Sequence, residues 1–201
     1  MKNILCYGDS NTFGLNPKDF SRYDENTRWT ALLQKNLGEE YKVINEGMPN
    51  RTGFVDNPDG TVYSSQKHFP ETLLKTESLH ILILAIGTND LMFKYNITID
   101  TVEKGLNNLI KTAKEKTNNI IIIPPTIMTE NILNGYFSSM FDETSIIKAK
   151  EIGKIYKQIS AENCCKYFDI NEFVMPSTID GLHYDKKTHK LIADRLTEIV
   201  R

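Results

Sequence analysis

Long hydrophobic runs and an excess of basic residues are both missing from this sequence of 201 residues. The longest apolar run, Ile81 to Ile86, is far too short to cross a bilayer. The net charge is −2, and the chain has no basic tail, basic stripe or amphipathic basic segment. The sequence therefore argues against a nucleic acid and against a membrane as partners.

A secretory signal and a disulfide framework are missing as well. The first residues, MKNILCYGDS, have neither the long apolar region nor the small-residue cleavage site of a signal peptide. Of the three cysteines, Cys6 lies in an apolar run, and Cys164 and Cys165 are neighbours. This arrangement does not form a disulfide framework, so we expect a cytoplasmic protein in a reducing compartment.

The sequence also lacks the usual phosphate-binding motifs. No Gly-Lys-Ser/Thr occurs at the spacing of a P-loop, and the stretch GDSNTFG, residues 8–14, does not match Gly-x-Gly-x-x-Gly. The same stretch does not match the Gly-x-Ser-x-Gly elbow of α/β-hydrolases, because Thr12 follows Asn11. These absences argue against a nucleotide cofactor and leave the role of Ser10 open.

Five short apolar runs typical of strands are present, with helical patterns between them. The runs are Ile4–Tyr7, Tyr41–Asn45, His80–Ile86, Ile120–Ile123 and Lys166–Ile170. Strands that alternate with helices predict a parallel sheet with helices on both faces, and a run such as ILILAI suits a strand buried on both sides. The composition, 40% hydrophobic and 25% charged, is that of an ordinary globular domain. We therefore predict a single α/β domain over residues 1–201, a three-layer α/β/α sandwich with a five-stranded parallel sheet.

Apolar residues at helical spacing place the helices. One helix is expected from Trp29 to Leu37, with Gly38 as its C-terminal stop. A short helix is expected from Pro70 through Leu74, and another from a cap at Asp100 through Ala113. A longer helix is expected to begin at Asp142 or Thr144, with an inner face of Ile147, Ile152, Ile155, Tyr156 and Ile159. The last helix is expected from about Lys186, with an inner face of Leu191, Ile192, Leu196, Ile199 and Val200.

A polar loop follows each predicted strand. GDS follows the first strand, NEGMPNRTG the second, GTND the third and PPTIMTEN the fourth, and DGLHYD lies after the fifth. Ligands of such sheets bind outside the carboxyl ends of the strands. We therefore expect these polar loops to meet at one edge of the sheet.

Ser10 is a candidate nucleophile, and its alternative role is to cap the helix after the first strand. A nucleophilic serine needs a base, and the base needs an orienting partner. His183 lies in the loop IDGLHYD, three residues after Asp180, where a carboxylate can reach Nδ1 and leave Nε2 facing a hydroxyl. The other histidines are expected to be structural or solvated: His68 in a loop before Pro70, His80 at a strand start and His189 in a helix.

Two alternatives stay open for the loop of Asp180 and His183. Together with Asp185 it contains metal-ligand side chains, but no second histidine or cysteine cluster lies at a recognised spacing. The segment Asp180-Gly181 is otherwise only a turn. We favour the serine–histidine–aspartate arrangement and expect neither a metal nor a cofactor.

An oxyanion formed by attack of Ser10 needs preorganised hydrogen-bond donors. The side-chain amide of Asn89, in GTND after the most apolar strand, is one candidate, although asparagine also commonly begins a turn. The backbone N–H of Ser10 and those of the loop from Gly47 to Asn50 are the others.

With these four stretches in order, the chain resembles the SGNH hydrolases, also called the GDSL family of esterases and lipases. The matching blocks are GDSNTFG around Ser10, INEGMPNRT around Asn50, GTND around Asn89, and DGLH with Asp180 and His183. The resemblance implies that Ser10, Asp180 and His183 are catalytic and that Ser10, Asn50 and Asn89 form an oxyanion hole. It also implies a flavodoxin-like sheet without a bound cofactor.

Two positions depart from the family pattern. Asn11 replaces the leucine of GDSL, and Asn50 lies where the second block has a glycine. Asn50 retains a backbone N–H, and asparagine tolerates left-handed dihedrals better than most residues. A backbone donor is therefore expected at Asn50, while the shape of its loop stays open.

The stretches ILCYGDSNTFG, TRWTALL and VINEGMPNRT are most similar to the arylesterase branch, which implies hydrolysis of small acyl or aryl esters and acyl transfer to other acceptors. Alternatives that use the same site are a carbohydrate acetylesterase, a lysophospholipase and a thioesterase. A non-catalytic ligand-binding domain on the same scaffold is a further alternative. The expected partner is a small-molecule ester, and the oligomeric state, a homo-oligomer included, stays open.

Aromatic residues are candidates for an acyl or aryl pocket, although aromatics at such spacings more often belong to the core. The candidates are Trp29, Phe13, Tyr136, Phe137 and Phe141. We also expect the loop from Pro125 to Phe141 to shape access to the site.

Overall fold

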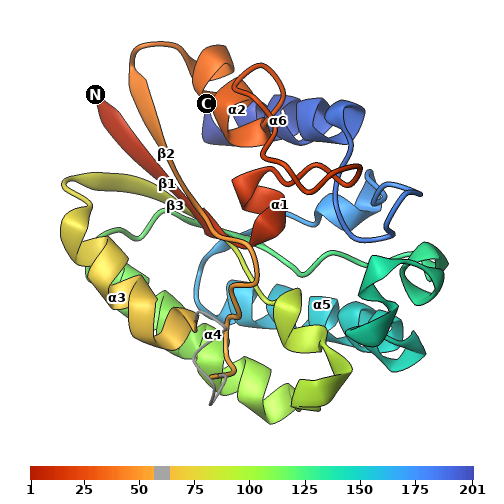
Figure 1. The fold of residues 1–201 in the computed structure, drawn as a ribbon. Helices are drawn as coiled ribbons and strands as arrows, with labels where there is room; N and C mark the ends of the chain where they lie inside the picture. The colour runs from red at the N-terminus through yellow and green to blue at the C-terminus, as the bar shows by residue number, and fades with distance from the viewer. Residues whose placement is uncertain (57–63) are drawn as a thin grey trace.

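The computed structural model describes residues 1–56 and 64–201, and a parallel sheet lies at its centre (Figure 1). The strands pair in the order β2-β1-β3-β4-β5, and each pairing is parallel. They are β1 (Lys2–Gly8), β2 (Tyr41–Gly47), β3 (Leu79–Ala85), β4 (Ile120–Ile123) and β5 (Lys166–Tyr167). The predicted five-stranded parallel sheet is confirmed, and its strand order is flavodoxin-like.

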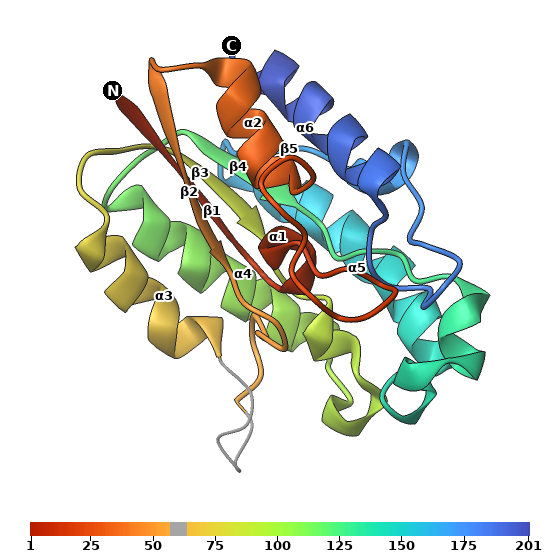
Figure 2. The ribbon, with the colours of Figure 1, turned by 45° about the horizontal axis from the view of Figure 1, so that its top comes forward.

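Helices cover both faces of this sheet (Figure 1, Figure 2). On one face α2 (Trp29–Leu37) lies beside α6 (Lys186–Val200), and the other face carries α3 (Ser65–Lys75), α4 (Ile99–Lys114) and α5 (Glu143–Glu162). The predicted three-layer sandwich is confirmed. Shorter turns are α1 (Ser10–Phe13), η1 (Asn89–Leu91), η2 (Phe93–Tyr95), η3 (Glu130–Asn134), η4 (Tyr136–Ser139) and η5 (Ile170–Glu172). No helix in the described ranges has both the length and the hydrophobicity needed to span a membrane.

The strands place their side chains alternately in two hydrophobic cores. On β1, Ile4 and Cys6 belong to the core with α2 and α6, whereas Leu5 and Tyr7 belong to the core with α3, α4 and α5. All four side chains are fully buried. Because both faces of the central strands are covered, these strands are apolar at nearly every position instead of alternating with polar residues.

The helix predicted to begin at Pro70 is longer than expected, and Pro70 lies inside it. The helix, α3, begins at Ser65, whose hydroxyl donates to the carbonyl oxygen of Thr52 at 2.7 Å. Phe69 and Leu73 from the same helix are buried in the core. These tertiary contacts outweigh the backbone hydrogen bond that a proline removes inside a helix.

The starts of α4 and α5 show which side chains act as helix caps. Of the two predicted starts of α5, Asp142 and Thr144, the cap is Asp142, because its carboxylate accepts the backbone N–H of Ser145 at 3.0 Å. The cap predicted for α4 is wrong: the Thr98 hydroxyl accepts the backbone N–H of Thr101, and Asp100 lies in the first turn. Thr98 has the extended backbone conformation that an N-cap requires.

Two isoleucines also differ from expectation. Ile147 of α5 is 57% exposed, because it precedes Ile152 by five residues, a spacing that places it away from the buried stripe of Ala149, Ile152 and Tyr156. β5 ends before Ile170, which begins η5 and packs into the core with α2 and α6.

Candidate active site

Ser10 lies at the carboxyl end of β1, at the point where the strand order of the sheet reverses. β1 pairs with β2 on one side and with β3 on the other, and open parallel sheets bind ligands at such a switch point. Asp9 caps α1, because its carboxylate accepts the backbone N–H of Asn11 at 3.0 Å. Ser10 is thereby held as the first residue of α1 and is 8% exposed.

Ser10, His183 and Asp180 form a continuous hydrogen-bonded chain. Nε2 of His183 lies 2.9 Å from Oγ of Ser10, and Nδ1 lies 2.6 Å from Oδ2 of Asp180. A carboxylate accepts the proton of Nδ1, which leaves Nε2 as the acceptor for the serine hydroxyl. The arrangement suits transfer of the Ser10 proton to the imidazole.

Asp180 is held by the loop that it begins. Its Oδ1 accepts the backbone N–H groups of Leu182 and His183, both at 3.0 Å. Burial acts to raise the pKa of Asp180, but the hydrogen bond with His183 and the two backbone donors outweigh it and hold the pKa below its usual value. Asp180 therefore faces Nδ1 as a carboxylate.

Gly181 allows the tight turn between Asp180 and His183. Its φ is +72°, a conformation that glycine adopts without strain. A Cβ at this position would lie 2.5 Å from the backbone nitrogen of Ile132, and the carbonyl oxygen of Gly181 accepts the backbone N–H of Thr129 at 3.0 Å. The loop that carries His183 is therefore packed directly against η3.

Asn89 and Asn50 line one pocket together with Ser10. Asn89 begins η1 after β3, and its side-chain nitrogen donates to the carbonyl oxygen of Arg51 at 2.9 Å. A side-chain amide has two N–H groups, so this bond orients the amide and uses one of them. Asn50 has a φ of +62°, the left-handed conformation that asparagine tolerates. The structure thus brings together all five residues expected at the site from the sequence.

Asp90, to which the sequence analysis gave no role, holds the loop after β2. Its carboxylate accepts the backbone N–H groups of Gly53, Phe54 and Val55 at 2.6, 2.8 and 3.0 Å. Burial raises the pKa of Asp90 to about 7, against the lowering effect of these donors. Asn89 and Asp90 bond to the same loop and hold it against η1. Because its three partners are backbone N–H groups, their residue types do not indicate the contact. The only sequence signal for this role of Asp90 is the aspartate of GTND.

Arg51 is a second residue near the site that the sequence analysis missed. Its buried guanidinium lies 4.1 Å from the ring centroid of Tyr7 and donates to the carbonyl oxygen of Gly8 at 2.9 Å and to that of Glu46. It therefore ties the loop after β2 to the end of β1, next to the segment that carries Ser10.

A largely apolar pocket of about 220 Å³ lies over Ser10 and His183. The ring centroid of Phe137 lies 5.4 Å from that of His183 and 5.7 Å from that of Phe20, and the Phe20 and Tyr136 centroids are 4.9 Å apart. The other apolar lining residues are Leu15, Pro49, Met92, Met140, Phe141 and Leu182.

The structure divides the five aromatic candidates for the pocket. Three of them line it, namely Tyr136, Phe137 and Phe141. Trp29 is buried under α1, where its indole N–H donates to a backbone carbonyl of α1 at 3.1 Å, and the Phe13 ring packs against the Arg22 guanidinium at 4.4 Å. Phe20, which the sequence analysis missed, takes a place in the lining.

The residues of the alternative metal site are engaged elsewhere. Asp185 caps α6, because its carboxylate accepts the backbone N–H of Thr188 at 2.8 Å. Both ring nitrogens of His183 face Asp180 and Ser10. Within residues 1–56 and 64–201, no group of three or more His, Cys, Asp or Glu side chains is placed to hold a metal ion.

The remaining histidines lie outside this chain of contacts. His189 of α6 is fully buried, its Nδ1 accepts the backbone N–H of Trp29 at 3.4 Å, and burial lowers the pKa of His189 to about 4. His68 lies in α3 and not in a loop as expected, and His80 is exposed near the start of β3. His189 is therefore a structural residue that is held in its neutral form.

The sequence and the structure both match known esterases and lipases. The model of the GDSL-like Lipase/Acylhydrolase family matches residues 6–191. We find no match among curated proteins. Among solved structures, the native aryl esterase of M. smegmatis is 25% identical, with a TM-score of 0.91 and coverage of 100% of this chain and 99% of that chain.

Two further solved structures are similar over their length. A carbohydrate acetylesterase family member from Sinorhizobium meliloti is 27% identical, with a TM-score of 0.91 and coverage of 100% of this chain and 98% of that chain. A lipase/acylhydrolase from Enterococcus faecalis is 24% identical, with a TM-score of 0.71 and coverage of 100% and 95%. The latter likeness is one of fold alone.

Proposed function

The chain belongs to the GDSL-like lipase/acylhydrolase family and is a serine ester hydrolase, and we propose that Ser10, His183 and Asp180 catalyse its reaction on small acyl or aryl esters. The observation that carries this proposal is the hydrogen-bonded chain from Ser10 Oγ through the imidazole to Asp180, with contacts of 2.9 and 2.6 Å. In such a chain the base activates the hydroxyl, and the carboxylate orients the base.

The reaction proceeds in two halves. Oγ of Ser10 attacks the carbonyl carbon of the ester while Nε2 of His183 accepts the hydroxyl proton, and the carbonyl electron pair moves onto oxygen. Collapse of this tetrahedral intermediate breaks the bond to the alcohol, which leaves with the proton from His183. Water then attacks the acyl-enzyme, His183 takes a proton from it and returns that proton to Ser10, and the acid is released.

Three donors stabilise the oxyanion in this proposal. They are the backbone N–H groups of Ser10 and Asn50 and the second side-chain N–H of Asn89. The bond from Asn89 to Arg51 at 2.9 Å supports this role, because it fixes the amide before the substrate binds. Donors that are already in place need no reorganisation when the charge develops.

The pocket supports a small, apolar substrate. Its volume of about 220 Å³ is below the range of about 300–1,000 Å³ that is usual for larger ligands. The Phe137 ring lies beside His183, from which the leaving alcohol receives its proton, so a flat aryl group fits this side. The likeness to a carbohydrate acetylesterase supports an acetylated sugar as the second candidate substrate.

Covalent labelling tests the nucleophile. A fluorophosphonate should label the wild-type protein at Ser10 and should not label Ser10→Ala. The variant should keep at most a residual rate enhancement of about 10³–10⁴ over water. A wild-type protein that is not labelled, or a Ser10→Ala protein with full turnover of p-nitrophenyl acetate, would refute the mechanism and favour a non-catalytic binding domain or another nucleophile.

A substrate panel tests the substrate class. We expect phenyl and p-nitrophenyl esters with acetyl chains to be turned over faster than those with octanoyl chains, because of the small pocket. Acetylated sugars, lysophospholipids and thioesters belong in the same panel. If one of these three classes is turned over faster than the aryl esters, that class is the substrate and the aryl ester proposal is wrong.

A further inference from the structure

Asn11, the residue after Ser10, is bonded to the loop that carries His183. The side chain of Asn11 is buried, and its Nδ2 lies 3.2 Å from the carbonyl oxygen of Leu182, the residue before His183. The same nitrogen lies 3.1 Å from Oγ1 of Thr126, in the segment after β4. Because a backbone carbonyl can only accept, the amide nitrogen of Asn11 must face Leu182.

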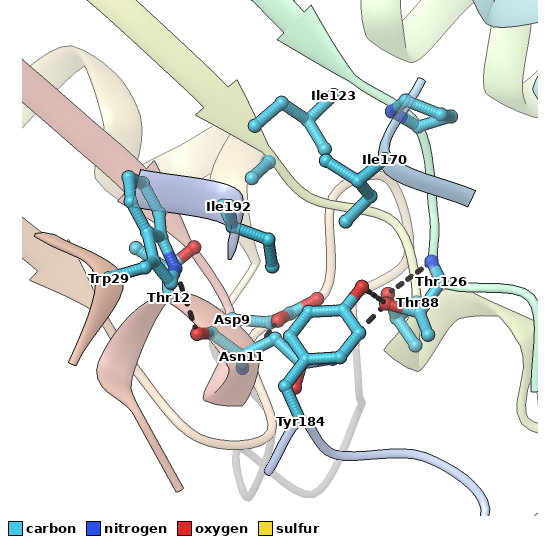
Figure 3. A pocket seen from close by; sticks show the side chains of 12 residues that line it. Asp9, Asn11, Thr12, Trp29, Thr88, Ile123, Thr126, Ile170, Tyr184 and Ile192 are labelled. Carbon is cyan, nitrogen blue, oxygen red and sulfur yellow. Dashed lines mark hydrogen bonds between the residues drawn. The ribbon is translucent and has the colours of Figure 1, made fainter. Parts of the chain in front are cut away.

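Tyr184, the residue after His183, is bonded to the same point. Its hydroxyl lies 2.7 Å from Oγ1 of Thr126, which also accepts the Asn11 amide. Figure 3 shows the hydroxyl of Tyr184 directed at Thr126. The residues on both sides of His183 are therefore tied to Asn11, one directly and one through Thr126.

We propose that Asn11 is a positioning residue that fixes the distance between Ser10 and His183. The inference rests on the proposed roles of those two residues, which are 173 positions apart in the sequence. Their 2.9 Å contact requires α1 and the His183 loop to keep a fixed relative position. Buried hydrogen bonds suit this task, because water does not compete for them, and small displacements of reacting groups lower rates strongly.

The neighbouring space does not offer a ligand site that would explain Asn11 instead. The cavity drawn in Figure 3 has a volume of about 20 Å³, which is too small for any ester. Asp9, Thr88 and Tyr184 are among the residues that line it with Asn11. The two acceptors of the Asn11 amide nitrogen are both groups of the protein.

Leucine, which the GDSL pattern has at this position, fills a similar volume but can donate neither of the two hydrogen bonds of the Asn11 amide. The tie between α1 and the His183 loop is therefore a feature of the asparagine side chain itself.

Asn11→Leu tests the proposal, because it keeps the volume and removes both donors. We expect kcat/KM for phenyl acetate and the rate of fluorophosphonate labelling to fall together by about 10- to 100-fold. Inhibition by ethyl phenyl ether, an analogue without a carbonyl group, should not change, because Asn11 does not line the substrate pocket. Asn11→Ser, which is too short to reach either acceptor, should give the same result if the leucine variant does not fold.

Asn36→Leu is the matched control. The Asn36 amide also donates two side-chain hydrogen bonds, to Asp194 and Thr197 at 3.2 Å each, but these join α2 to α6. Asn36→Leu should lower the melting temperature and leave the rate of fluorophosphonate labelling unchanged. A comparable fall in the labelling rate here would show that any loss of stability slows the reaction.

Two results would overturn the proposal. One is a folded Asn11→Leu or Asn11→Ser protein that is labelled at the wild-type rate. The other is a loss of affinity for ethyl phenyl ether that accounts for the whole fall in kcat/KM, because Asn11 would then shape the pocket and not the contact between Ser10 and His183. A wild-type protein that is not labelled would instead refute the proposed function.

Discussion

The substitution Asn89→Ala tests two roles of one side-chain amide. One N–H donates to the buried carbonyl oxygen of Arg51 at 2.9 Å, and the other is the proposed donor to the oxyanion. Loss of an oxyanion donor lowers kcat by about 10²–10³, or roughly 2.7–4 kcal/mol of transition-state stabilisation. Loss of the bond to Arg51 leaves a buried carbonyl without a donor, which costs about 1–3 kcal/mol of unfolding free energy.

Both quantities are measured on one preparation, kcat with p-nitrophenyl acetate and the free energy of unfolding with urea. Asn36→Ala is the control, because its amide joins α2 to α6 away from the pocket. It should become less stable and keep its kcat. Asn89→Asp keeps the shape of the side chain but directs oxygen at both partners, so it should be less active than Asn89→Ala.

The outcome that refutes the reasoning is specific. If Asn89→Ala loses stability but keeps the wild-type kcat, the amide only holds the loop of Arg51, and the oxyanion assignment is wrong. If Asn89→Ala keeps both the wild-type kcat and the wild-type free energy of unfolding, the hydrogen bond to Arg51 does not contribute to stability either.

Three further predictions concern residues around the site. Burial lowers the pKa of His189 from 6.5 to about 4, so between these pH values the unfolded chain binds more protons than the folded protein. His189 should therefore contribute a fall of about 3 kcal/mol in the free energy of unfolding as the pH drops from 7 to 4 (6.5 − 4 = 2.5 in pKa, at about 1.36 kcal/mol per pKa unit). This contribution is the difference between wild type and His189→Gln, and equal pH dependence in the two proteins would contradict it. Asp90→Asn leaves at least one of the three backbone N–H donors of Gly53, Phe54 and Val55 without an acceptor, so the loop after β2 should be held less firmly. We expect kcat to fall roughly 10-fold and inhibition by ethyl phenyl ether to stay unchanged. An unchanged kcat would show that the bonds of Asp90 to this loop are dispensable for the reaction. Phe137→Ala should lower kcat/KM for phenyl acetate about 10-fold more than for ethyl acetate, because only the phenyl group stacks on this ring, and equal losses would contradict an aryl-binding wall.

The sheet could be predicted because its central strands, β1, β3 and β4, are buried on both faces. Runs such as Ile120–Ile123 are apolar throughout, and proline, glycine or polar residues follow these runs directly. The position of the candidate site follows from the same fact, since parallel strands place their carboxyl ends at one edge. Ser10 and Asn89 could therefore be placed together although they lie far apart in the sequence.

The remaining differences arise where tertiary contacts decide. Pro70 reads as a helix start, but the contacts of Ser65 and Phe69 extend α3 before it. Asp90 bonds only to backbone N–H groups, which every residue but proline offers, so no sequence pattern reveals its partners. Phe20 enters the pocket through a left-handed backbone, with a φ of +58°, which its residue type does not suggest.

The contact between Gly181 and η3 matters for protein engineering. The chain runs from η3 directly into η4, which carries Phe137, so one continuous stretch supports the histidine loop and forms a wall of the pocket. Redesign within that stretch would alter selectivity and turnover at once. Phe20 belongs to a separate hairpin, closed by the bridge between Leu15 and Arg22, so a library confined to residues 16–21 is the better route to new substrates.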